Sequence, residues 1–180
     1  MARLPLEMSD RNAASFDWFL WLLWIMATAW GWIVGHILFP AIYLVAAGVG
    51  VAVFQWLILQ RRLGRSWRWL VYTAAGWLAG VLLALAMGHF EAGFGAGLLL
   101  GVTTGLAQWL ILRREVRWAA WWIPISAAGW STGLSMALAP LLAGILAGAM
   151  TGIALVLLLS YPRQPQAAAS RGAPSRSTDG

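Results

Sequence analysis

The chain has 180 residues, of which 61% are hydrophobic and 10% are charged, with a formal net charge of +6. A soluble globular domain is about half apolar and about a quarter charged, so this composition excludes a water-soluble fold and predicts a membrane protein. The absence of cysteine excludes disulfides and thiolate metal sites, and the absence of lysine excludes a lysine Schiff base.

Six apolar segments follow one another along the chain, each close to the roughly 20 residues that a transmembrane helix needs. They are residues 16–39, 41–60, 68–88, 92–112, 118–139 and 141–160. Residues 1–15 form an N-terminal segment, and residues 161–180 are rich in Pro, Gln, Ala, Ser and Gly, which predicts a disordered tail. The predicted fold class is therefore an all-α membrane protein with six transmembrane helices.

The first two segments introduce two elements that recur later in the chain. The first contains Gly31-Trp32, and the second contains Gln55 in the run Gln-Trp-Leu-Ile-Leu. Trp32 is expected to pack over small residues of a neighbouring helix; the alternative is an aromatic pocket for a pigment, quinone or sterol. Gln55 is expected to form an interhelical hydrogen bond worth about 1 kcal/mol; the alternative is a polar group that lines a solute path.

The third and fourth segments repeat both elements and add glycines at four-residue spacing. Trp77 follows a glycine as Trp32 does, and Gln108 begins a second Gln-Trp-Leu-Ile-Leu run with the same two interpretations as Gln55. Residues four apart share one face of a helix, and small residues there let two backbones approach closely. The packing glycines predicted in these segments are Gly76, Gly80, Gly97, Gly101 and Gly105.

The fifth and sixth segments form a third version of this pair, in which Leu155 takes the place of the glutamine and Trp130 again follows a glycine. The packing glycines predicted here are Gly129, Gly133, Gly144, Gly148 and Gly152. Residues 129–133 also match the pattern G-x-S-x-G, but a transmembrane helix cannot form the strand–turn–helix that this nucleophile needs. No catalytic residue is therefore predicted, and the protein is not expected to be an enzyme.

The copies recur at roughly 45 to 53 residues, one two-helix hairpin for each, which predicts three parallel hairpin repeats. The arginines lie in residues 1–15, in the connections after the second and fourth segments, and in the tail, while the other connections contain none. Because cytoplasmic loops carry an excess of arginine and lysine, both termini are predicted to be cytoplasmic, in a bacterial inner membrane. This topology accounts for the positive charge, so nucleic-acid binding is not expected.

Tryptophans near the arginine-rich ends of the segments are expected in the headgroup layer, where an amphipathic ring is favoured. They are Trp18, Trp21, Trp56, Trp67, Trp69, Trp109, Trp118, Trp121 and Trp122. At the opposite ends lie His36, His89 and Glu91, a set that could ligate a metal ion. The favoured interpretation of this set is two interfacial histidines and a solvated loop glutamate, so no metal is assigned and no cofactor is named.

The repeated Gln-Trp and Gly-Trp hairpins, over about residues 30 to 160, resemble uncharacterised bacterial Trp- and Gly-rich multi-span membrane proteins. The resemblance rests on the texture of the repeats and implies a multi-span protein of the bacterial inner membrane, without a particular activity.

Three functions are compatible with these patterns. The first is a non-catalytic structural or assembly subunit, whose glycine faces pack within the chain, against a membrane-protein partner or against a second copy. The second is a binder or carrier of a small apolar ligand at Trp32, Trp77 and Trp130. The third is a channel or transporter for small solutes, lined by Gln55 and Gln108.

Overall fold

The computed structural model describes residues 16–62, 66–89, 93–136 and 140–162. Within these ranges every regular element is helical, and a single isolated bridge pairs Val116 with Pro162. The elements are α1 (Trp18–Leu38), η1 (Pro40–Ile42), α2 (Tyr43–Leu59), α3 (Trp67–Ala86), α4 (Phe94–Glu115), η2 (Ala119–Trp121), α5 (Trp122–Ser135) and α6 (Pro140–Leu159). The all-helical prediction is confirmed.

Five helical segments of the described chain are long and apolar enough to cross a bilayer, which makes this a multi-pass membrane protein. They are α1, η1 with α2, α3, α4 and α6, and they coincide closely with five of the six predicted segments.

The α-helix in the predicted segment 118–139 is shorter than the segment itself: α5 has only 14 residues. At 1.5 Å per residue such a helix is about 21 Å long, which is less than the roughly 30 Å of hydrocarbon in a bilayer. The chain enters this segment through the 3-10 turn η2, and Pro124 follows in the first turn of α5. Proline is tolerated there because N–H groups of a first turn have no partner within the helix.

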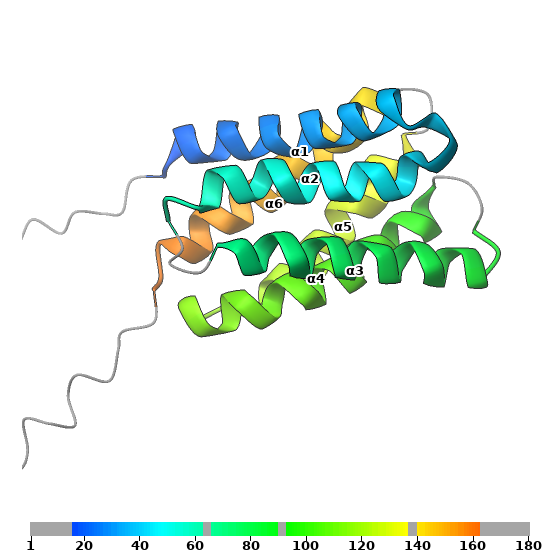
Figure 1. Cartoon of the computed structure of the whole chain (residues 1–180). Helices are drawn as coiled ribbons and strands as arrows, with labels where there is room; N and C mark the ends of the chain where they lie inside the picture. Colours follow the sequence, from blue (N-terminus) through cyan, green and yellow to red (C-terminus); the bar gives the residue numbers. More distant parts are fainter. Residues whose placement is uncertain (1–15, 63–65, 90–92, 137–139, 163–180) are drawn as a thin grey trace, which may run out of the picture.

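Helices α1 to α6 form a closed ring. Each packs mainly against the next one in sequence, and α6 packs against α1 to complete the circle. Figure 1 shows the helices running side by side, with the start of α1 and the end of α6 at the same end of the bundle.

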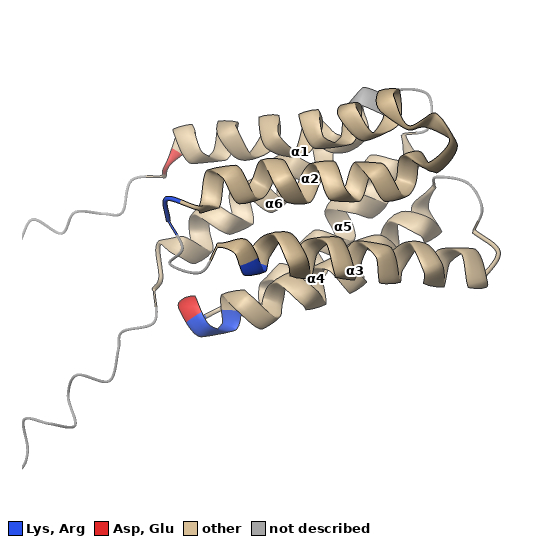
Figure 2. Ribbon diagram, in the orientation of Figure 1, with Lys and Arg blue, Asp and Glu red and all other residues tan. Residues whose placement is uncertain are grey.

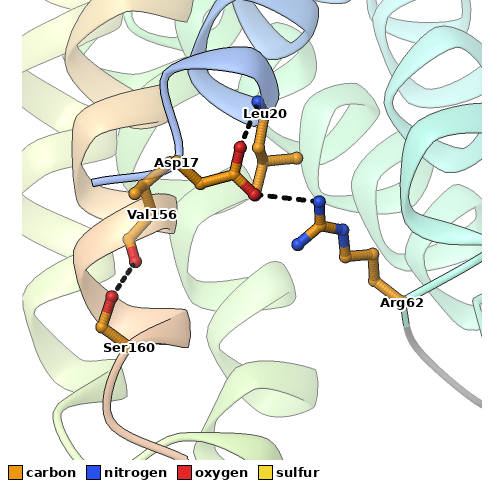
Figure 3. A network of polar contacts seen from close by, with 5 residues as sticks. All are labelled: Asp17, Leu20, Arg62, Val156 and Ser160. Carbon is orange, nitrogen blue, oxygen red and sulfur yellow. Dashed lines mark hydrogen bonds and ion pairs between the residues drawn. The ribbon is translucent and has the colours of Figure 1, made fainter. Parts of the chain in front are cut away.

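All the described arginine, aspartate and glutamate residues lie at this end, which we call the charged end (Figure 2). Asp17 caps α1 there: its carboxylate accepts a hydrogen bond from the Leu20 backbone N–H at 2.9 Å and from Arg62 at 2.9 Å (Figure 3). The Leu20 N–H, followed by the Arg62 guanidinium, holds the pKa of Asp17 below its usual value. At the end of α6, Ser160 donates a hydrogen bond to the Val156 carbonyl at 2.9 Å.

Candidate functional site

The ten glycines singled out in the sequence all lie against neighbouring helices of the same chain. Those of α4 face α5, those of α6 face α1, those of α3 face α4, and those of α5 face α6. At Gly101 a Cβ atom would come within 2.6 Å of the Ala127 Cα and the Ser126 carbonyl oxygen, which are backbone atoms of α5. At Gly129 the same atom would be 3.4 Å from the Ala147 carbonyl oxygen, an ordinary contact. The approach of the backbones is therefore closer at some of these glycines than at others.

Three tryptophans meet inside the charged half of the ring, one from each odd-numbered helix. The ring centroids of Trp24, Trp69 and Trp122 are 5.7 to 6.2 Å apart, and every pair is edge-to-face. Each of these side chains is at most 1% exposed. Edge-to-face aromatic pairs contribute about 0.5 to 1.5 kcal/mol beyond the burial of their area, so this cluster ties α1, α3 and α5 together across the centre of the ring.

The indole N–H of each of these tryptophans donates to the helix that precedes it in the ring. Trp69 donates to Oε1 of Gln55 at 3.2 Å and Trp122 to Oε1 of Gln108 at 2.7 Å. Trp24, whose preceding neighbour α6 carries no glutamine, donates to the Thr151 hydroxyl at 3.1 Å instead. The three tryptophans thus make the same kind of contact with the preceding helix, but the acceptor is a glutamine amide in two cases and a threonine hydroxyl in the third.

The two glutamine amides also donate across the bundle. Nε2 of Gln55 donates to the Thr28 hydroxyl at 3.1 Å, and Nε2 of Gln108 donates to the Thr73 hydroxyl at 3.0 Å. Nε2 of Gln108 also lies 3.5 Å from Oε1 of Gln55. Both glutamines are at most 4% exposed. Their hydrogen bonds reach three other helices, as the interhelical interpretation of these residues expects.

Sequence reasoning missed the three inner tryptophans. Trp24 was not singled out, and Trp69 and Trp122 were expected to face the headgroup layer, whereas both side chains are buried between the helices at the centre of the bundle. A sequence signal for them does exist: the pattern W-x-x-x-[ST]-x-x-x-W occurs at residues 24–32, 69–77 and 122–130. Its members are spaced by four residues and so share one helix face.

The last tryptophan of each pattern belongs to a second cluster, in the half of the ring away from the charged end. This cluster consists of Trp32, Trp77 and Trp130. The Trp130 ring lies 4.5 Å from that of Trp77 and 6.0 Å from that of Trp32. The Trp77 indole N–H donates to the Leu44 carbonyl at 2.7 Å. Trp32 is only 2% exposed, and its indole N–H has no hydrogen-bond partner.

The tryptophans at the outside of the charged end behave differently from Trp69 and Trp122. Four of these tryptophans expose more than half of their surface: Trp18, Trp67, Trp118 and Trp121. Such exposure is compatible with the headgroup layer, where one side of the ring meets lipid and the other meets water.

The two histidines of the possible metal-ligating set lie in different surroundings. The His36 ring stacks on Trp32 at 6.3 Å and meets Tyr43 edge-on at 4.9 Å. The His89 ring fills the space that a Cβ at Gly95 would occupy, and Glu91 lies outside the described residues. In the described part of the chain, no group of three or more His, Cys, Asp or Glu side chains could hold a metal ion.

Comparisons with family models, with curated proteins and with solved structures give no match to this chain.

Proposed function

We propose that this chain is a non-catalytic subunit of the bacterial inner membrane, which crosses the bilayer six times with both termini in the cytoplasm. In this proposal the charged end is cytoplasmic, because arginine is retained on that side, and the short helix α5 crosses together with η2 and its flanking residues. The three helix pairs α1–α2, α3–α4 and α5–α6 are parallel hairpins around a pseudo-three-fold axis.

One observation carries the proposal: the centre of the ring is occupied by tryptophan. The rings of Trp24, Trp69 and Trp122 are mutually in contact in one half, and the Trp130 ring contacts those of Trp32 and Trp77 in the other. Protein interiors packed in this way leave little space for a solute. A closed core of this kind supports a structural role over a conducting one.

The glutamines support the same conclusion. The amide of Gln108 donates to Thr73 and Gln55 and accepts from Trp122, so its groups are already engaged within the protein. A solute that used Gln108 would have to replace bonds that are costly to leave unmade in a buried site. The packing glycines face helices of the same chain, so a partner protein or second copy would contact the outer, lipid-facing side chains.

The test is to measure solute flux and mass on the same preparation. Purified full-length protein in liposomes is expected to give no flux of ions, water or glycerol above that of empty liposomes. Native mass spectrometry is expected to show the chain alone or with protein subunits. Flux that disappears in the Gln108→Leu variant, with folding retained, would contradict the proposal and favour the channel.

A second candidate, a binder of a small apolar ligand, is favoured by two unpaired polar atoms. Nε1 of Trp32 and Nδ1 of His36 are both buried without a hydrogen-bond partner, one helical turn apart on α1. A buried donor without a partner costs about 1 to 3 kcal/mol, and a ligand with a carbonyl oxygen, such as a quinone, would satisfy Trp32. Absorbance and mass spectrometry of gently purified protein test this: a bound molecule that is lost in Trp32→Phe would establish it, and bare protein in repeated preparations would reject it.

A further inference from the structure

A cleft of about 530 Å³ opens at the charged end, beside the end of α4 and the turn η2. Its lining residues are Trp109, Arg113, Arg114, Arg117, Ala119 and Ala120. Pockets that hold a single small ligand have volumes of about 300 to 1,000 Å³. This cleft is therefore large enough for a ligand, and half of its lining residues are arginines.

The backbone that carries these arginines is fixed by contacts from the other end of the sequence. Val116, between Arg114 and Arg117, is 1% exposed and belongs to the same apolar cluster as the inner tryptophans. The Arg117 N–H donates to the Tyr161 carbonyl at 3.2 Å, beside the bridge between Val116 and Pro162. The arginine side chains thus project from a segment that is held against the residues directly after α6.

Among the residues that the structure describes, no carboxylate forms an ion pair with the arginines of the cleft. The ion pair among the described residues joins Arg62 to Asp17, in another part of the charged end, and no described carboxylate pairs with Arg113, Arg114 or Arg117. The Arg113 guanidinium lies 5.1 Å from the centre of the Trp109 ring, an arrangement that orients the planar group and leaves its edge free to donate hydrogen bonds. The cleft therefore presents donors to an anion.

We propose that this cleft binds the phosphate-bearing headgroup of an anionic phospholipid. Arginine forms paired hydrogen bonds with phosphate oxygens, and basic pockets at the cytoplasmic ends of transmembrane helices suit such headgroups. A lipid is favoured over a soluble phosphate because Trp118 and Trp121, next to the cleft in sequence, are 58% and 59% exposed. Exposed indole rings at this level place the cleft in the headgroup layer. The proposal rests on the membrane insertion assumed in the proposed function.

The test compares two matched double variants of the full-length protein in neutral detergent. Arg113→Gln with Arg117→Gln removes two charges and one arginine–tryptophan contact from the cleft. Arg61→Gln with Arg68→Gln removes the same charge elsewhere at the charged end, together with the contact of Arg68 with Trp67. Titration with phosphatidylglycerol, followed by native mass spectrometry, should show a binding constant weakened about tenfold or more in the first variant only.

Two further arms fix the identity of the ligand. Phosphatidylethanolamine, which carries no net charge, should bind the wild-type protein at least about tenfold more weakly than phosphatidylglycerol. Glycerol phosphate should bind at least about tenfold more weakly than phosphatidylglycerol; equal affinity would mean that the site takes soluble phosphate and that the lipid assignment is wrong. Equal weakening in both double variants, or no binding to the wild-type protein, would overturn the proposal and leave the non-catalytic function untouched, because flux is measured separately.

A variant that keeps all the arginines guards against misfolding in the double variants. Ala120→Glu places a negative charge on the exposed wall of the cleft, and Gln60→Glu makes the same kind of change at the exposed end of α2. Only Ala120→Glu should weaken phosphatidylglycerol binding. If both variants bind like the wild-type protein, the cleft is not the lipid site.

Discussion

Gln55 and Gln108 meet inside the bundle, where Nε2 of Gln108 lies 3.5 Å from Oε1 of Gln55. They occupy the same position in two identical Gln-Trp-Leu-Ile-Leu runs, one in α2 and one in α4. At the third equivalent position stands Leu155, which is completely buried. Amide oxygens of α2 and α4 therefore accept from Trp69 and Trp122, whereas the Thr151 hydroxyl of α6 accepts from Trp24.

The first prediction concerns the bond between Gln108 and Trp122. Gln108→Leu should lower the free energy of unfolding by about 1 to 3 kcal/mol, because the Trp122 N–H and the Thr73 hydroxyl lose a buried partner. Trp122→Phe keeps most of the ring packing but removes the N–H. The double variant should be less destabilised than the sum of the single variants, as measured by denaturant titration in detergent; strict additivity would show that the bond has no energetic role. Gln60→Leu, at an exposed position, is the control and should have little effect.

The second prediction distinguishes two of the packing glycines, Gly101 in α4 and Gly129 in α5. Gly101→Ala should destabilise the bundle by about 1 to 3 kcal/mol, because its Cβ would meet backbone atoms of α5 at 2.6 Å. Gly129→Ala should be neutral, or stabilising by up to about 1 kcal/mol, since its Cβ finds 3.4 Å of space and alanine favours helix. Thermal unfolding followed by size-exclusion chromatography provides the measurement. A reversed order of stability would mean that the helix packing differs from the one described.

The third prediction concerns the orientation of the chain in the membrane. Because the protein has no cysteine, single cysteines report their own position without background labelling. Met87→Cys, at the end opposite the arginines, should react with a membrane-impermeant maleimide added to intact cells, whereas Tyr161→Cys should react only after the inner membrane is opened. Both native side chains are more than half exposed. Labelling in the opposite order would invert the proposed topology.

The fourth prediction is a dependence of stability on pH at the start of α1. The pKa of Asp17 is lowered in the folded protein, so the folded state binds this proton more weakly than the unfolded chain does. The stabilisation is complete above the ordinary pKa of 3.8 and is lost as the pH falls through the lowered value. Asp17→Ala should cost about 0.5 to 1 kcal/mol at neutral pH, and this difference should vanish in acid. Asp17→Asn should keep the cap and remove the pH dependence.

Most of the helices can be predicted from the lengths of the apolar segments alone. The lengths of the apolar runs predicted α1, α2, α3, α4 and α6 to within a few residues. Segment 118–139 was predicted less well, because the 3-10 turn at Ala119–Trp121 shortens the α-helix. Apolar composition does not reveal that shortening, which depends on the local geometry of the backbone.

The inner tryptophan cluster shows why the interior was harder to predict. Tryptophan at the end of a transmembrane segment is most often interfacial, and Trp69 and Trp122 were assigned on that preference alone. Their spacing of eight residues from Trp77 and Trp130 puts each pair on the same inner face of its helix. The arginines of the cleft were visible in the sequence, but the cleft itself forms where α4 ends and the chain turns through η2. The path of the backbone at such a turn is not readable from one sequence.

The ring joins α1 to α6, the first and the last of the described helices. Because α6 follows the other described helices along the chain, the Trp24 N–H of α1 gains its partner only when α6 is in place. The Thr151 hydroxyl of α6 donates to the Ala147 carbonyl of its own helix at 2.6 Å, so this hydroxyl brings no unpaired donor to the contact with α1. A glutamine at the position of Leu155 would bring an amide whose N–H groups need partners in neighbouring helices, and unpaired N–H groups are costly in hydrocarbon. The helix that closes the ring thus offers its tryptophan a threonine where α2 and α4 offer glutamines.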